Sequence, residues 1–113
     1  HLQRNEAPAD VQATLLELSS QSISSAVLNY CTGAKEIYLC GGGAHNTALL
    51  NRLKTQLAPG NVLLTDQLGI EADWLEAIAF AWLASQTMAG LCANLPEATG
   101  ARHPCILGAI YQA

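Results

Sequence analysis

Three consecutive glycines, Gly41, Gly42 and Gly43, follow an apolar segment and are succeeded by His45 and Asn46. Glycine has no Cβ, so the backbone at these positions can turn sharply and lie flat against a flat or anionic ligand. A helix that starts just after the glycines directs its unpaired N–H groups to the same place. The segment therefore predicts a site where the main chain itself contacts a nucleotide.

The polar residues near the glycines have structural interpretations beside functional ones. His45 is more simply a helix-start residue than an acid or base, because no carboxylate or nucleophile is visibly placed to work with it. Asn46 can cap the next helix, and a cap is compatible with a ligand contact. Asp66 is as well explained by a turn before Gly69 as by a ligand contact at a strand end.

Helices and strands alternate around this site. Asp10 is the predicted N-cap of a long helix to about residue 29, and a short strand is predicted over 37–40. A second helix over 46–57 and a second strand over 61–65 follow. The apolar residues at helical spacing in the first helix are Val11, Leu15, Leu18, Ala26 and Tyr30, and those of the second are Leu49, Leu50, Leu53 and Leu57.

A third helix is predicted from about Glu71 and is apolar on nearly every side, so we expect it to be buried. The segment 106–111 either pairs as a strand or packs as a turn. This order predicts an α/β fold in which helices cover both faces of a small mixed sheet. Two strands alone make a poor sheet, so further strands are expected from 106–111, from a partner chain or from sequence outside these 113 residues.

Composition narrows the classes of function. The chain has 113 residues, of which 50% are hydrophobic and 12% charged, with a net charge of −4. This predicts one compact unit over residues 1–113 and no basic stripe for nucleic acid. No apolar run has the length of a membrane span and the first residues are too polar for a signal sequence, so a soluble cytoplasmic protein is expected. The first residue is histidine, which suggests a processed product or a piece of a longer protein.

The four cysteines, Cys31, Cys40, Cys92 and Cys105, include no C-x-x-C pair. Cys40 also falls inside a strand predicted to be buried. Free thiols are therefore expected rather than disulfides, and no metal site is predicted.

Three nucleotide motifs can be compared with the glycines. A Walker loop fails, because it needs a lysine followed by Ser or Thr. A dinucleotide fingerprint fits in part, with Asp66 placed to bind a ribose, but Asn46 replaces its third glycine. The adenosine motif of the actin, sugar kinase and heat-shock ATPase superfamily fits at every position of 39–44, Leu-Cys-Gly-Gly-Gly-Ala.

Further blocks along the chain make the third motif specific. The sequence from Asp10 onward resembles the C-terminal part of anhydro-N-acetylmuramic acid kinases, a family of bacterial cell-wall recycling. The matching blocks, in order, are 10–15, 41–46, 65–66, 69–70, 76–84, 94–96, 99–101 and 107–111.

The resemblance implies a ribonuclease-H-like C-terminal lobe of a two-lobed kinase, with ATP and Mg²⁺ between the lobes. Such enzymes use water to open the 1,6-anhydro ring of the sugar and transfer the γ-phosphoryl group to O6. The resemblance implies that Gly41, Gly42 and Gly43 lie along the adenosine with Asn46 nearby. It implies a supporting role at the sugar for Glu76, whose apolar neighbours argue against a simple solvated position.

The catalytic aspartate and phosphate loop of such kinases stand far upstream, and nothing before Asp10 in this sequence matches them. We therefore expect these 113 residues to be inactive alone. Two alternatives stay open: a dinucleotide-binding module, and a noncatalytic interaction domain derived from a kinase. A homodimer is also an open alternative.

Overall fold

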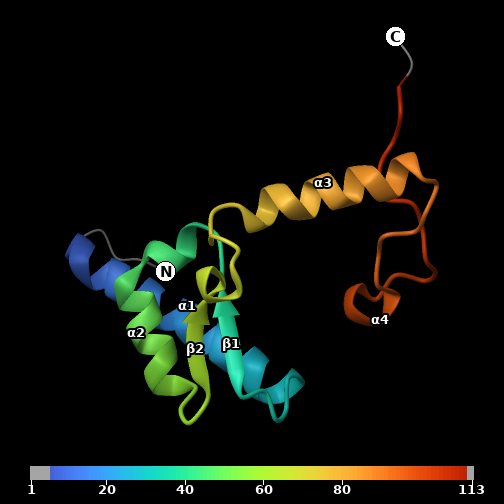
Figure 1. Ribbon diagram of the computed structural model, residues 1–113. Coiled ribbons are helices and arrows are strands. Elements are labelled where there is room, and N and C mark those ends of the chain that lie inside the picture. Colours follow the sequence, from blue (N-terminus) through green and yellow to red (C-terminus); the bar gives the residue numbers. More distant parts are fainter. Residues whose placement is uncertain (1–5, 112–113) are drawn as a thin grey trace. The chain divides into compact units, whose positions relative to one another are not determined.

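The computed structural model describes residues 6–111. The chain divides into two compact units, the first ending at Ala72 and the second starting at Asp73. The first unit contains the elements α1 (Pro8–Tyr30), β1 (Glu36–Leu39), the 3₁₀ helix η1 (Gly42–His45), α2 (Thr47–Gln56), β2 (Asn61–Leu64) and the 3₁₀ helix η2 (Thr65–Leu68) (Figure 1). The second contains α3 (Leu75–Met88) and α4 (Pro96–Thr99).

The two strands form a parallel sheet, in which Glu36 pairs with Asn61 and Leu39 pairs with Leu64. Helix α2 connects them, and a helical crossover returns the chain to the edge where the first strand began, which makes the strands parallel. The prediction of a mixed sheet is therefore wrong for the part of the chain described, where 106–111 forms no strand.

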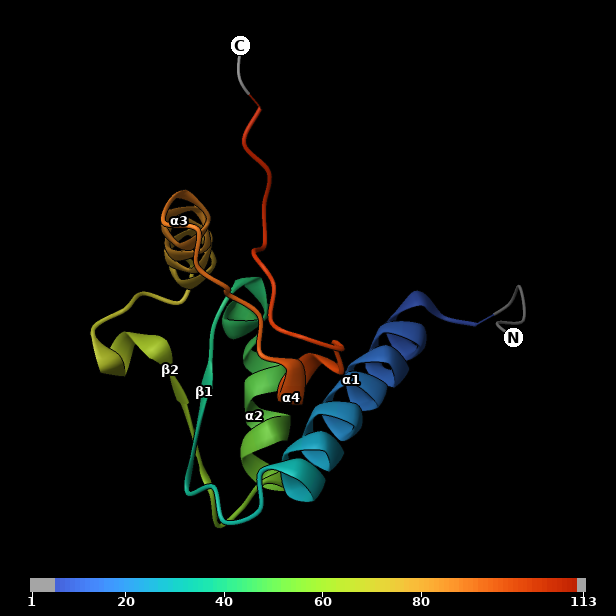
Figure 2. The same cartoon turned by 90° about the vertical axis from the view of Figure 1, so that its right-hand side faces the viewer.

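Helices α1 and α2 lie on the same side of this sheet (Figure 2). The core between them and the strands consists of the buried Leu53, Leu57 and Val62, and Val27, Ile37, Leu39, Leu49 and Leu50 pack around it. The apolar face predicted for α2 is confirmed by these contacts. The prediction that helices cover both sheet faces does not hold within the first unit.

Helix α1 contacts α2 in part through small polar residues. Ser20 and Ser24 are buried, whereas Leu15, Leu18 and Tyr30 are 55%, 61% and 86% exposed. The apolar residues at helical spacing therefore do not form the contact face. Small side chains allow a closer approach of two helices than leucines do, and in this helix Leu15 and Leu18 stay exposed. The helix also begins earlier than predicted, with Ala7 as N-cap, Pro8 next and Asp10 in its first turn.

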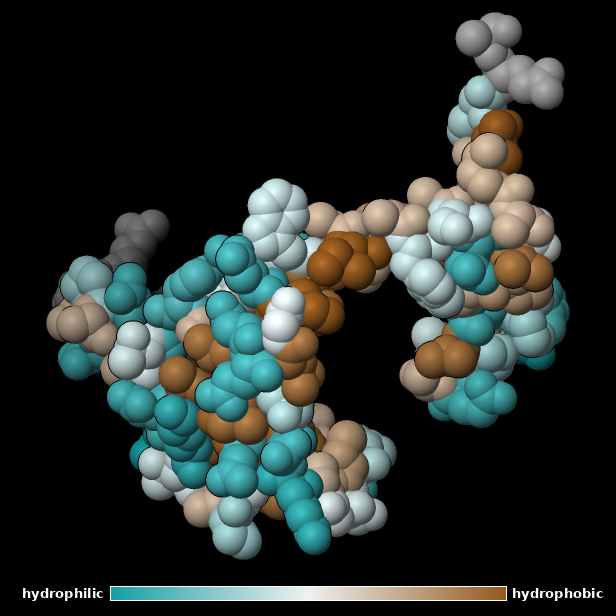
Figure 3. All heavy atoms as spheres, viewed as in Figure 1, coloured by the Kyte–Doolittle hydropathy of each residue, from teal (hydrophilic) through white to brown (hydrophobic). Residues whose placement is uncertain are grey.

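The second unit is built on α3, which begins four residues later than predicted. None of its side chains is buried, and Ile78, Phe80, Trp82 and Met88 are exposed. Figure 3 shows hydrophobic surface along this helix. The expectation that α3 is buried is thus wrong for this chain, because too few other residues are available to cover it.

The C-terminal part of the second unit is held by one amide side chain and one hydroxyl. Asn94 donates from Nδ2 to the carbonyl of His103 (3.1 Å) and accepts from the backbone N–H of Cys105 (2.6 Å). Thr87 Oγ1 donates to the carbonyl of Leu107 at 2.9 Å or to that of Leu83 at 3.0 Å. These bonds close the loop that carries α4 and hold the final segment along α3.

All four cysteines lie in the described part of the chain and are free thiols. Cys40 is exposed because β1 ends one residue before it, so its predicted burial is wrong. Among residues 6–111, no helix combines the length and apolar character needed to cross a membrane.

Candidate functional site

The glycines join β1 to α2 at the carboxyl edge of the sheet. Gly41 has φ of 70° and ψ of −173°, a conformation that is essentially restricted to glycine. Its N–H donates to the carbonyl of Ala72 (2.8 Å), and its carbonyl accepts from Ala44 N–H (2.9 Å). Gly41 therefore has a structural reason to be glycine, since it makes the turn that starts η1.

Gly42 and Gly43 have no such reason. Neither has a positive φ. A Cβ built on Gly42 would meet no atom within 4 Å, and one on Gly43 would meet only Leu49 Cδ2, at 4.0 Å. Both residues are exposed. The protein itself therefore leaves a bare and accessible stretch of backbone at these positions, and no packed side chains separate it from a ligand.

Asn46 is the N-cap of α2. Its Oδ1 accepts a hydrogen bond from the backbone N–H of Leu49 at 3.1 Å, so the predicted cap is confirmed. This bond uses one lone pair of the side-chain oxygen and leaves the amide Nδ2 available as a donor. Asn46 can thus cap the helix and present a donor to a ligand at the same time.

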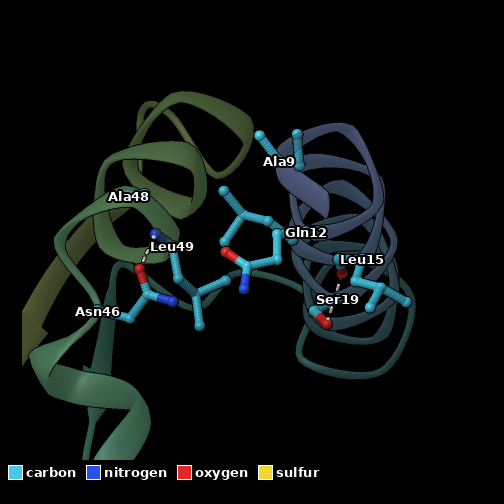
Figure 4. A pocket seen from close by; sticks show the side chains of 9 residues that line it. Ala9, Gln12, Leu15, Ser19, Asn46, Ala48 and Leu49 are labelled. Carbon is cyan, nitrogen blue, oxygen red and sulfur yellow. Dashed lines mark hydrogen bonds between the residues drawn. The ribbon is translucent and has the colours of Figure 1, made fainter. Parts of the chain in front are cut away.

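A groove of about 660 Å³ opens between α1 and α2 on the side of Asn46. Its walls come from the N-terminal halves of the two helices: Ala9, Gln12, Ala13, Leu15, Leu16 and Ser19 on α1, and Asn46, Ala48 and Leu49 on α2. Figure 4 shows the side chains of Gln12 and Leu49 pointing toward one another across it. The groove combines apolar walls with two amides, a lining suited to a flat heterocycle with polar edges.

Asp66 lies at the same edge of the sheet as the glycines. Leu39 and Leu64 are register partners, and Gly41 and Asp66 each follow their strand by two residues. Asp66 is exposed in η2. Thr65 beside it is buried, and its hydroxyl oxygen has no hydrogen-bond partner among the described residues. The predicted placement of Asp66 at the carboxyl end of the second strand is confirmed, while a ligand contact of Asp66 stays a prediction.

Glu76 and His45, the other two candidates from the sequence, are both exposed. Glu76 is in the first turn of α3, in the second unit, and it is exposed, so the expectation that its carboxylate is shielded from solvent is wrong. His45 is the last residue of η1. Among residues 6–111, no three His, Cys, Asp or Glu side chains gather as metal ligands would.

The groove was not predicted from the sequence. Gln12 belongs to one of the blocks that carry the resemblance, but the residue types around it indicate no site. The signal that could have found the groove is the run of Ala9, Gln12, Ala13, Leu16 and Ser19, which recurs at helical spacing along one side of α1. These side chains are mostly small or polar, and Leu15, one of the apolar residues at helical spacing in the same helix, also lines the groove.

These features define the class: a small α/β unit with a bare glycine turn at the carboxyl edge of a parallel sheet, beside a groove between two helices. The family model described as Anhydro-N-acetylmuramic acid kinase matches residues 1–113. The chain belongs to the anhydro-N-acetylmuramic acid kinase family.

Individual relatives agree with this assignment. The chain is 55% identical to the anhydro-N-acetylmuramic acid kinase of Nitrosospira multiformis over 113 residues, which are 100% of this chain and 31% of that protein. It is 53% identical to the one of Nitrosomonas europaea over 112 residues, 99% of this chain and 31% of that protein. It is 55% identical to the one of Thiobacillus denitrificans over 106 residues, which are 94% of this chain and 28% of that protein. The chain thus spans less than a third of these relatives.

Proposed function

We propose that the first unit binds the adenosine part of ATP, as part of a kinase acting on anhydro-N-acetylmuramic acid. The observation that carries this proposal is the bare backbone at Gly42 and Gly43, which the fold does not itself require. A residue type that packing does not explain is explained by a ligand that approaches the backbone closely. Family membership supports ATP as the ligand, because the matched family model and relatives are described as kinases.

The geometry supports a position for each part of the nucleoside. The base would enter the groove, between Leu49 on α2 and the small residues of α1, with Gln12 offering an amide to its polar edge. The ribose would lie along Gly42 and Gly43. Asn46, which lies at the junction of turn and groove, would donate from Nδ2 while its oxygen caps α2.

In the intact enzyme, the reaction proposed is opening of the 1,6-anhydro ring by water and phosphorylation at O6, in cytoplasmic recycling of peptidoglycan. The 113 residues would supply a ribonuclease-H-like C-terminal lobe, while the catalytic aspartate would come from the other lobe. Taken by themselves, they are proposed to be inactive. Glu76, exposed at the start of α3, is proposed to face the sugar.

Mg²⁺ would accompany ATP in that enzyme. Magnesium is usually held by one or two carboxylates together with substrate phosphates. We propose no residue of this chain as a ligand of the ion. The part of these residues is to bind and orient the nucleoside.

The test is a calorimetric titration of the 113-residue chain with Mg·ATP and separately with NAD. The variant Gly42→Val places a side chain where the ribose would lie, in space that is empty of protein. It should weaken ATP binding by about tenfold or more, a cost near 1.4 kcal/mol. The control is Ala34→Val, an exposed enlargement close to the other end of β1, which should bind ATP like the parent chain.

Each alternative gives a different result. Binding of NAD in preference to ATP would favour the dinucleotide module. Failure to bind either nucleotide would favour the noncatalytic interaction domain, for which the exposed apolar surface of α3 is also expected. If Gly42→Val binds ATP with the same affinity as the parent chain, the proposal that the ribose lies along the glycines is wrong.

A further inference from the structure

The helices that form the groove are joined farther along by a polar cluster, which consists of Glu17, Ser20, Ser24, Arg52 and Gln56. Ser24 Oγ donates to Gln56 Oε1 at 2.9 Å. Gln56 Nε2 donates to Glu17 Oε1 at 3.2 Å and to Ser20 Oγ at 3.3 Å. Arg52 Nε donates to Glu17 Oε2 at 2.6 Å. Every member of the cluster bonds across the two helices.

The cluster and the groove occupy neighbouring stretches of the same two helices, which overlap at residues 17–19 of α1. On α1 the groove is lined by residues 9–19, and the cluster takes residues 17–24. On α2 the groove is lined by residues 46–49, and the cluster takes residues 52 and 56. Figure 2 shows the helices close together toward their C-terminal ends and apart at their N-terminal ends. The groove lies where the spacing between α1 and α2 is wide, and the cluster lies where that spacing is narrower.

The chemistry of the cluster is suited to holding the two helices at one spacing. Ser20 is completely buried and Ser24 is 5% exposed, so these small residues let α1 and α2 approach closely. Buried polar groups lose much of their stabilisation when their partners move out of hydrogen-bond range. A leucine contact would tolerate sliding, whereas directional bonds from Gln56 to three residues of α1 permit few arrangements.

We propose that the cluster is a positioning device for the groove, in which Gln56 and Glu17 set how far the N-terminal ends of α1 and α2 stand apart. The inference rests on the proposed function, since the groove is the site assigned to the base. None of the five residues lines the groove. Their effect on nucleotide affinity is therefore indirect, through the spacing of Gln12 and Leu49.

The informative variant is Gln56→Glu. It removes the donor that Glu17 and Ser20 accept from, and it sets a second carboxylate beside Glu17 between the helices. The helices should then spread, and ATP affinity should fall by about fivefold or more, as in typical coupling between separate sites. The double variant Glu17→Gln/Gln56→Glu exchanges the amide and the carboxylate across the interface and should recover most of the affinity.

A matched control separates spacing from charge. Gln21→Glu adds the same negative charge next to Glu17, but Gln21 is exposed on α1 and donates to Glu17 within that helix instead of bonding across to α2. It should leave ATP affinity within about twofold of the parent, since surface charges near one another have small effects. A loss equal to that of Gln56→Glu would mean that charge alone acts on the nucleotide, and would overturn the proposal.

Helix spacing is also measured without nucleotide. Nitroxide labels on the exposed positions 14 and 51, in a background with the four cysteines replaced by serine, report the distance between α1 and α2 by electron paramagnetic resonance. Gln56→Glu should broaden the distance distribution, and the exchange variant should narrow it again. An unchanged distribution together with unchanged ATP affinity would overturn the positioning role. Absence of ATP binding by the parent chain, with a distribution that still responds, would overturn the proposed function and support the spacing role.

Discussion

The amide of Gly41 donates to the carbonyl of Ala72 over 2.8 Å, which ties the start of the glycine turn to the segment that follows η2. Ala72 is itself buried. The turn is thus held from two sides, by β1 through the chain and by the 65–72 segment through this bond. Its backbone can remain bare toward solvent because its conformation does not depend on side chains of its own.

Gly41→Ala should destabilise the first unit by about 1 to 3 kcal/mol, because its φ of 70° with ψ of −173° is strained for any residue with a Cβ. Urea denaturation followed by circular dichroism gives the free energy of unfolding. Gly42→Ala is the matched control, since its Cβ enters open space, and it should change stability by no more than about 0.5 kcal/mol. Equal losses in both variants would contradict the assignment of the strain to Gly41.

Asn46→Ala should cost about 0.5 to 2 kcal/mol of stability by removing the cap on Leu49 N–H. Asn46→Ser keeps a capping oxygen and should retain most of that stability. If Asn46 also donates to the nucleotide, both variants lose ATP affinity, because serine cannot reproduce the amide Nδ2. Calorimetry beside thermal denaturation separates the two roles. Parent-like affinity in the serine variant would restrict Asn46 to capping.

The Glu17→Gln variant should show a pH dependence that differs from that of the parent. Hydrogen bonds from Arg52, and then from Gln21, hold the pKa of the Glu17 carboxyl below its usual value. A lowered pKa in the folded state means stabilisation that is present above the unfolded value, about 4.3, and is lost as pH falls through the folded pKa. The parent should exceed the variant in stability at neutral pH, and the difference should vanish in acid.

Urea midpoints measured at pH 7 and at successive acidic values test this expectation. Arg52→Gln removes the main partner of Glu17 and should show a similar loss at neutral pH. A difference between parent and Glu17→Gln that grows on acidification would contradict the expected direction of the pH dependence.

Gly108→Ala should release the C-terminal segment from α3. A Cβ at this residue would lie 2.8 Å from Thr87 Oγ1 and 3.1 Å from its Cγ2, and φ at Gly108 is 150°. Thr87 is short and fixed on a helix, so it has little room to move. Hydrogen exchange of the Cys105 amide, which donates to Asn94 Oδ1, should accelerate in Gly108→Ala. Adding Thr87→Ala should relieve the contact but not the backbone strain, so protection should stay below that of the parent.

The sequence predicted well those parts of the fold that are set by local patterns. The cap at Asn46, the apolar face of Leu53 and Leu57, and the strand, glycine turn and helix in succession follow from residue types a few positions apart. The contact face of α1 could not be predicted in this way. Burial of Ser20 and Ser24 depends on partners such as Gln56, 32 residues beyond Ser24, and no periodicity within α1 reports them.

The site divides in the same manner. The glycines were evident because three residues without side chains are unusual in any context. The groove required two helices to meet, and its α1 wall mixes small and polar side chains with Leu15 and Leu16, so it resembles an ordinary exposed helix face. The expected burial of α3 was inferred from its apolar residues on nearly every side, and that of Glu76 from its apolar neighbours, whereas burial depends on the amount of protein available as cover.

The uncovered apolar helix α3 has a thermodynamic consequence for any measurement on these 113 residues. Removing a side chain such as Phe80 or Trp82 from water contributes about 1.5 to 3 kcal/mol. That contribution is unrealised while both rings remain hydrated. A melting temperature measured on these 113 residues is therefore a lower limit for the second unit. Covering the two rings with other apolar groups would raise that melting temperature.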